Sequence, residues 1–335
     1  MTPLIGHHAN QRQFLAAIRS GKMHHGWILA GPQGLGKHLF ARHAATQLLG
    51  SNAPPESDLF DTDILPGPQR QMIDAKTHPD CHELEREAKN DTERKKQEKG
   101  QVYECRRNIR IDQVRALQRR FVTRPSLSDQ RVIIIDAVDD LERNAANALL
   151  KSLEEPPRNT VFLLISHSPG RLLPTIRSRC LMMRFHPLPP EQMQQVIALM
   201  QPDLPAEQTR ALLDTAGGIP GRINGLLDAD VATLVEAVHA ILDQGDHDHR
   251  HRLTLASLLA GKGAVDRVGA FLSRLPKILA DHARRSKGAQ RMACISARSE
   301  IEQLASELPR YNYDPQALVF RIGGLLASVA ATRDG

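Results

Sequence analysis

The sequence predicts an α/β domain with a mostly parallel sheet, followed by a helical region. Short apolar runs at 27–30, 131–135 and 160–165 alternate with segments of helical periodicity, and the first run ends at a glycine-rich loop. Strands that alternate with helices favour a parallel sheet covered on both faces. From Pro187 onward the pattern is helical, and no convincing strand pattern occurs after residue 230.

The helices are predicted from their apolar periodicity and their end signals. Phe14 and Ile18 lie on one face of the first helix, and Pro156-Pro157 ends the last helix of the α/β region. The helices predicted before residue 187 span 10–20, 37–49, 112–121 and 144–155. Residues 51–110 interrupt the alternation with paired prolines and a mixed-charge run, so we expect an insertion of loops with a solvated helix or ribbon.

Composition sets broad limits on function. The chain has 335 residues, enough for two or three domains, and its net charge of +6 permits contact with nucleic acid without establishing it. Aromatic residues make up only 4% of the chain, which disfavours a single-strand binder that stacks bases. No apolar run reaches about 18 residues, and the start lacks a signal-peptide pattern, so we expect a cytoplasmic protein without a membrane span.

Residues 31–38 form a phosphate-binding loop (P-loop) motif with one departure. Gly31, Gly34 and Gly36 allow backbone N–H groups to surround phosphate oxygens, and Lys37 can reach the outer phosphates. The motif usually ends in a Ser or Thr that binds Mg²⁺, whereas this chain has His38, and Mg²⁺ prefers hard oxygen ligands. The sequence thus predicts a degenerate nucleotide site, which is compatible with weak ATP or ADP binding and requires no cofactor.

A second phosphate-site motif is also incomplete. Asp136 ends an apolar strand, where P-loop ATPases place a carboxylate for Mg²⁺, but Ala137 follows it and cannot act on the attacking water as a glutamate would. Asp139 and Asp140 come too late to share that strand-end position. General-base catalysis contributes about 10²–10⁴-fold, so we expect negligible ATP hydrolysis. Ser166 ends the next strand, either as a turn residue or, as the resemblance to a known family given below implies, as a polar sensor near the γ-phosphate.

The cysteines do not form a recognisable metal-binding pattern. Cys81 and Cys105 lie in the expected insertion, Cys180 and Cys294 lie far from them, and no C-x-x-C pair occurs. His78 and His82 next to Cys81 could in principle complete a zinc site, but their spacing matches no structural zinc motif. We therefore predict no disulfide, no zinc and no other metal site.

Two further motifs give the chain a specific family resemblance. The segments 147–157 (NALLKSLEEPP) and 175–180 (TIRSRC) follow the P-loop and Asp136 in the order found in the clamp-loader branch of AAA+ ATPases, which the chain resembles over roughly residues 20–225. The resemblance implies a P-loop AAA+ domain with a parallel sheet over 1–187, a small helical lid over 188–228 and an all-α C-terminal collar domain over 229–335.

The resemblance also implies a role in replication. In this family the Ser-Arg-Cys run supplies an arginine finger to ATP held by a neighbouring subunit, which makes Arg179 the strongest candidate and Arg177 the alternative. The chain is then expected to be a non-motor subunit that supports loading of a sliding clamp onto primed DNA. Its implied partners are motor subunits of the gamma/tau type and a delta subunit, in a hetero-oligomer.

Two alternative functions remain open. The first is an ATP-hydrolysing motor with an unusual metal site, against which His38 and Ala137 argue. The second is a nucleotide-dependent AAA+ switch outside replication, against which the segment 147–157 argues. The resemblance implies that the chain is a component of a DNA polymerase holoenzyme, which is a nucleotidyltransferase complex. We expect the chain to have no significant ATPase or polymerase activity of its own.

Overall fold

The computed structural model describes residues 3–50, 59–60, 67–101, 103–223, 231–260, 264–272, 274–307 and 314–332. The chain divides into two compact units, one formed by residues 1–200 with 218–220 and the other by residues 201–217 with 221–335. Each unit is described by itself. In the part of the chain that the structure describes, no helix is long and apolar enough to cross a membrane.

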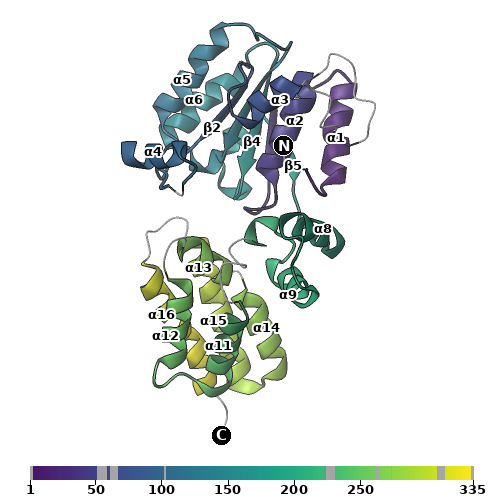
Figure 1. Ribbon diagram of the computed structural model, residues 1–335. Helices are drawn as coiled ribbons and strands as arrows, with labels where there is room; N and C mark the ends of the chain where they lie inside the picture. The colour runs from purple at the N-terminus through teal and green to yellow at the C-terminus, as the bar shows by residue number, and fades with distance from the viewer. Residues whose placement is uncertain are drawn as a thin grey trace. The chain divides into compact units, whose positions relative to one another are not determined.

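The first unit is built on a five-stranded sheet in the order β2-β3-β4-β1-β5, and every strand pair is parallel (Figure 1). The strands are β1 (Gly26–Ala30), β2 (Cys81–Glu85), β3 (Arg131–Asp136), β4 (Thr160–Ser166) and β5 (Leu181–Arg184). Ala30 pairs with Ser166, and Asp136 pairs with Ile165, so these strands end together at one edge of the sheet. The predicted α/β fold with a parallel sheet is confirmed.

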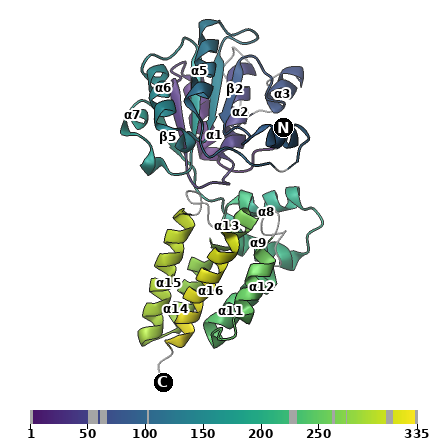
Figure 2. The ribbon, with the colours of Figure 1, turned by 90° about the vertical axis from the view of Figure 1, so that its left-hand side faces the viewer.

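Helices cover both faces of this sheet (Figures 1 and 2). One core cluster joins Phe14 of α1 and Phe40 of α2 to Leu163 of β4, and the other joins Leu149 of α6 to Phe162 of β4. Adjacent β4 residues thus serve opposite faces, as strand geometry requires. The helices of this unit are α1 (His8–Arg19), α2 (Lys37–Gly50), α3 (Gly67–Asp74), α4 (Asp91–Glu98), α5 (Ile111–Arg119), α6 (Arg143–Glu154), the short α7 (Pro174–Arg177) and α8 (Pro190–Met200).

The edge strand β2 lies inside the segment expected to be an insertion. Its sequence, Cys-His-Glu-Leu-Glu, carries charged residues, and three of its five residues are only partly buried. The central strands β1, β3 and β4 are buried on both faces and are therefore almost wholly apolar. This difference explains why the central strands were predicted from the sequence and β2 was not.

The second unit is helical throughout its described residues. Its helices are α9 (Ala206–Ala216), α11 (Val231–Gln244), α12 (Arg250–Leu259), α13 (Ala264–Leu272), α14 (Leu275–Arg285), α15 (Gly288–Glu307) and α16 (Pro315–Ala331). Helix α16 packs against α11, α12 and α15, and its buried face includes Leu318, Ile322 and Leu326. Residues 224–230, where the predicted lid meets the collar domain, lie outside the described residues, and the bounds of the three predicted domains stay a prediction.

Candidate nucleotide-binding site

The glycine loop joins the carboxyl end of β1 to the start of α2, which is the strand–loop–helix arrangement of a phosphate-binding loop. Gly31, Gly34 and Gly36 have φ angles of 155°, 85° and 83°, which side chains disfavour. At Gly31 an added Cβ would lie 2.6 Å from the backbone oxygen of Phe185. Glycine is therefore required at position 31 by close backbone contact as well as by the backbone angle.

Lys37 points back into its own loop. Its side chain is buried, and Nζ donates hydrogen bonds to the backbone oxygens of Gly31 and Pro32, each at 2.6 Å. Burial lowers the pKa of Lys37 to about 8, although the nearby Asp136 and Asp139 partly offset this effect. The ammonium that would contact the outer phosphates is thus held by carbonyl groups of the loop.

His38, in the first turn of α2, is part of a charge cluster centred on Glu83. Its Nε2 lies 3.2 Å from Oε2 of Glu83 on β2, and the same carboxylate is 3.3 Å from both Arg42 Nε and Lys76 Nζ. Burial of Glu83 acts to raise its pKa, but the hydrogen bond and charges of His38, Lys76 and Arg42 hold that pKa below its usual value. The His38 ring is therefore engaged with Glu83, at the position where a Mg²⁺-binding hydroxyl is usual.

The carboxylate of Asp136 lies near a histidine that sequence analysis did not single out. His167 Nε2 is 3.9 Å from Asp136 Oδ1. Burial and the charge of Lys37 lower the pKa of His167, against the opposing effect of Asp136 and Asp139. Ala137, at the position of the missing base, is buried. The chemistry at this strand end is thus an imidazole beside a carboxylate, without a glutamate.

Ser166 is fully buried and bonded within the chain. Its Oγ donates to Oδ1 of Asp139 at 3.0 Å, and the backbone N–H of His167 donates to Oδ2 of the same carboxylate. Asp139 therefore joins the site by a route that sequence spacing did not indicate, whereas Asp140 pairs with Arg86 at 3.2 Å. A sensor role for Ser166 stays a prediction.

Arg179 lies just before β5, at the amino ends of the strands, whereas the P-loop lies at their carboxyl ends. Strands β1 and β5 are parallel, with Trp27 opposite Leu181 and Ala30 opposite Arg184, so Arg179 precedes the amino end of β5 while the loop follows the carboxyl end of β1. Arg179 Nη1 donates to the backbone oxygen of Thr175 at 2.9 Å, and Nη2 lies 2.8 Å from Glu154 Oε1. The side chain is still 34% exposed. Arg177, the alternative, is exposed on α7.

The cysteines of the described part lie apart. Cys81 is buried in the core and Cys105 is exposed, and within the described ranges no group of three His, Cys, Asp or Glu side chains is arranged to hold a metal ion. Burial raises the pKa of both Cys81 and Cys180 to about 12, so neither thiol is reactive near neutral pH. The absence of zinc stays a prediction.

The sheet order, the P-loop after β1 and the carboxylate at the end of β3 define a P-loop domain of the AAA+ class. Within that class, the family model described as "DNA polymerase III, delta subunit" matches residues 6–189, more than half of the chain, and the chain belongs to this family. The clamp-loader resemblance indicated by the sequence motifs is thereby confirmed.

Individual relatives agree with this assignment. The chain is 38% identical to the DNA polymerase III subunit delta' of Pseudomonas aeruginosa over 225 residues, which cover 66% of this chain and 62% of that relative. It is 27% identical to the Escherichia coli subunit delta' over 304 residues, which cover 88% of this chain and 80% of the relative. A DNA polymerase III subunit gamma from Buchnera aphidicola is 32% identical over 177 residues, which cover 51% of this chain and 42% of that relative.

Among solved structures, the chain is similar to a DNA polymerase III gamma subunit-related protein from Thermotoga maritima. The two share 15% sequence identity and a TM-score of 0.49, over 96% of this chain and 99% of the other.

Proposed function

We propose that the chain is a non-motor subunit of the DNA polymerase III clamp loader. In this role it supports ATP-dependent loading of a sliding clamp onto primed DNA, and it completes the ATP site of a neighbouring subunit through Arg179. The family membership supports a clamp-loader component, and the local geometry of the P-loop supports the absence of motor activity.

The observation that carries this proposal is the pair of substitutions at the chain's own phosphate site. His38 is engaged with Glu83, and Ala137 stands where a catalytic glutamate is usual. Because a general base contributes about 10²–10⁴-fold and metal bridging adds more, losing both groups removes most of the means to hydrolyse ATP. Weak ATP or ADP binding by Lys37 and the loop backbone is compatible with this role.

The position of Arg179 supports action on another subunit. It lies before the amino end of β5, whereas the chain's own P-loop follows the carboxyl end of β1. Arg179 is therefore poorly placed to reach a phosphate bound in that loop. Nη1 and Nη2 of Arg179 are held by Thr175 and Glu154, and the side chain stays 34% exposed. A fixed, exposed guanidinium is suited to stabilise charge on a γ-phosphate from outside.

The proposed partners follow from the family. They are gamma/tau-type motor subunits and a delta subunit, and the sliding clamp and primed DNA are contacted by the assembled complex. The proposed location is the cytoplasm, where chromosomal replication takes place in bacteria.

The test is DNA-stimulated ATP hydrolysis by a complex reconstituted from this chain and its motor subunits. Arg179→Ala is compared with wild type and with Arg177→Ala, which removes an equal charge two residues away and tests the alternative finger. We expect Arg179→Ala to lower turnover several-fold while the complex still assembles, and Arg177→Ala to leave it near wild type. Equal activity of the wild-type and Arg179→Ala complexes would exclude the finger role.

A further inference from the structure

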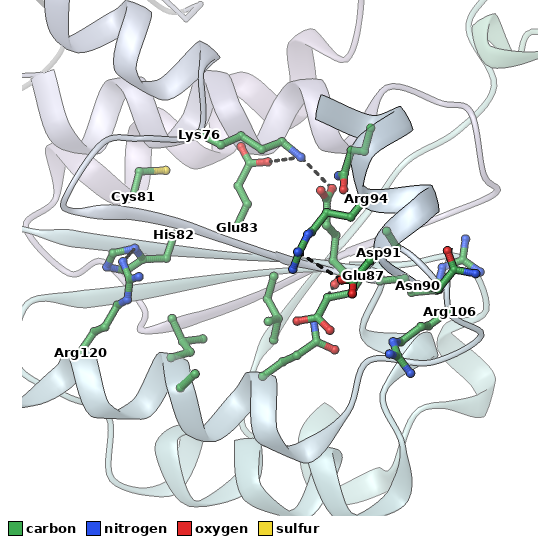
Figure 3. Close-up of a pocket in the computed structure, with 18 residues that line it drawn as sticks. Lys76, Cys81, His82, Glu83, Glu87, Asn90, Asp91, Arg94, Arg106 and Arg120 are labelled. Carbon is green, nitrogen blue, oxygen red and sulfur yellow. Dashed lines mark hydrogen bonds and ion pairs between the residues drawn. The ribbon is translucent and has the colours of Figure 1, made fainter. Parts of the chain in front are cut away.

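A pocket of about 570 Å³ lies along the free edge of β2, outside the nucleotide site (Figure 3). Its lining comes from β2, from α4 and from the face of α5 that approaches β2, and most of that lining is polar or charged. Nothing in the proposed clamp-loader role uses this pocket.

The backbone of β2 is available to a ligand on this side. The N–H of Val132 on β3 donates to the backbone oxygen of Asp80, and a parallel ladder uses alternate residues of each strand. By this alternation the N–H and C=O of Glu83 face away from β3. The amide of Gln113 donates to the outward backbone oxygen of Glu85, and the N–H of Cys81 bonds to His78, which fits the same alternation. Among the described residues, none forms a backbone hydrogen bond with the outward N–H or C=O of Glu83, so the middle of β2 is an open strand edge.

The charges around this edge are mostly paired with one another. Lys76 contacts Glu83 and Glu85, Arg86 contacts Asp140, and Arg94 contacts Asp91. The charges of these side chains are therefore balanced within the chain, and they need no ligand to pair with.

Two arginines in the lining have no acidic partner within the described part of the chain. The Nε of Arg106 is buried without any hydrogen-bond partner. The Nη1 of Arg120 lies 3.4 Å from His82 Nδ1, but that imidazole brings no negative charge, and its pKa is lowered to about 4 by burial and by the charges of Arg120 and Arg131. Figure 3 shows Arg120 beside His82 at one end of the pocket and Arg106 at the other.

We propose that this pocket binds an extended, acidic segment of another polypeptide, which adds a strand to the free edge of β2 and places carboxylates on Arg106 and Arg120. Backbone hydrogen bonds to the middle of β2 would supply the register, and the two guanidinium groups would select acidic side chains on either side of it. The lining includes neither a residue of the P-loop 31–38 nor Arg179, although Glu83 contacts His38.

A peptide fits the pocket better than a nucleic acid does. Glu83, Glu85, Glu87 and Asp91 also line the pocket, and a continuous row of phosphates would lie against these carboxylates. A peptide can present its negative charges only at the ends and neutral groups between them. The open strand edge also matches a peptide backbone and has no equivalent use for a sugar–phosphate chain.

The proposal can be tested by fluorescence anisotropy with the full chain and a labelled peptide of sequence Glu-Glu-Val-Thr-Val-Thr-Val-Glu-Glu. Three comparison probes are the same peptide with Lys in place of Glu, the acidic peptide with methylated backbone nitrogens at the central residues, and an unlabelled oligothymidylate as competitor. The protein variants are Arg106→Ala/Arg120→Ala and the matched control Arg115→Ala/Arg119→Ala, which removes two exposed arginines of α5 that do not line the pocket.

We expect the acidic peptide to bind wild type and the control variant alike, and to bind Arg106→Ala/Arg120→Ala at least tenfold more weakly. Backbone methylation should weaken binding by a similar factor, because it removes donors while it keeps the charges. The methylated peptide also tests strand addition without any change to the protein. Absence of binding at 1 mM peptide, equal binding of the methylated or Lys peptide, or full displacement by oligothymidylate would overturn the proposal.

Discussion

His38 Nε2 lies 3.2 Å from Oε2 of Glu83, a residue 45 positions further along the chain. The pair joins the first turn of α2, where a P-loop protein needs a metal-binding hydroxyl, to the edge strand β2. Arg42 and Lys76 contact the same carboxylate. The position that serves Mg²⁺ in active P-loop ATPases is therefore used in this chain to attach β2 to α2.

The first prediction concerns the stability of this cluster. Glu83→Gln should lower the free energy of unfolding by about 3 kcal/mol at pH 7, because it leaves three cationic or hydrogen-bonding groups around a side chain that is only 6% exposed. Glu85→Gln, whose carboxylate is 38% exposed, should change it by less than about 1 kcal/mol. Urea unfolding of the purified variants measures both values.

The same carboxylate predicts a pH dependence. The folded-state pKa of Glu83 is below its usual value of 4.5, so its contribution is complete above that value and is lost as the pH falls through the folded pKa. The difference between wild type and Glu83→Gln should therefore shrink on acidification below about pH 4.5. A difference that stays constant down to pH 3 would contradict the ion-pair account.

A second prediction concerns Lys37, whose folded-state pKa is about 8. Between pH 8 and its usual value of 10.5 the unfolded chain binds more protons at this residue than the folded chain does, so this residue makes stability rise with pH. The stability of wild type relative to Lys37→Met should increase by up to about 1.4 kcal/mol per pH unit in this window. Paired urea titrations at pH 7.5, 8.5 and 9.5 test it, and a pH-independent difference would exclude the low pKa.

A third prediction separates two glycines of the loop. Gly31→Ala should destabilise the protein by about 3 kcal/mol, because its Cβ would lie 2.6 Å from the Phe185 oxygen at a φ of +155°. Gly36→Ala has a φ of +83° but no neighbour within 4 Å, and should cost about 1 kcal/mol. Thermal or urea unfolding of both variants gives the ranking, and an equal loss would show that the close contact with Phe185 is unimportant.

A fourth prediction concerns the support of Arg179. The reconstituted complex with Glu154→Gln should turn over ATP more slowly than the wild-type complex and faster than the Arg179→Ala complex. The reason is that the substitution removes the ion pair that fixes the guanidinium group of Arg179. It should leave the stability of the chain within about 1 kcal/mol, since the pair is partly exposed. Glu155→Gln on the neighbouring residue is the matched control, and turnover equal to that of this control would indicate that Glu154 does not position Arg179.

The sequence predicted the elements whose pattern is set by local chemistry. The central strands are apolar because both faces are buried, and the glycine loop is readable because its backbone angles and contacts need glycine. Helix α6 ends at Glu154, shortly before Pro156 and Pro157, as the prolines indicated. The division of residues 268–279 between α13 and α14, in contrast, was not predicted from the sequence.

The candidate site was only partly predictable. Lys37, His38 and Asp136 follow from motifs, but the pairing of His38 with Glu83 depends on the sheet bringing β2 beside α2, which no spacing in the sequence reveals. His167 directly follows a predicted strand, which makes it a candidate for the site. Its approach to Asp136, however, depends on β3 and β4 ending together. That Arg179 and the P-loop lie at opposite ends of the strands likewise became known only from the parallel pairing of β1 with β5.

The central claim is that this chain completes a neighbour's ATP site and does not use its own. The most direct measurement compares Arg179→Ala with Lys37→Met in DNA-stimulated ATP hydrolysis by the reconstituted clamp-loader complex, with assembly checked for each variant. The account predicts a several-fold loss of turnover for Arg179→Ala and turnover close to wild type for Lys37→Met. Loss of turnover with Lys37→Met and not with Arg179→Ala would contradict it and would make this chain a motor.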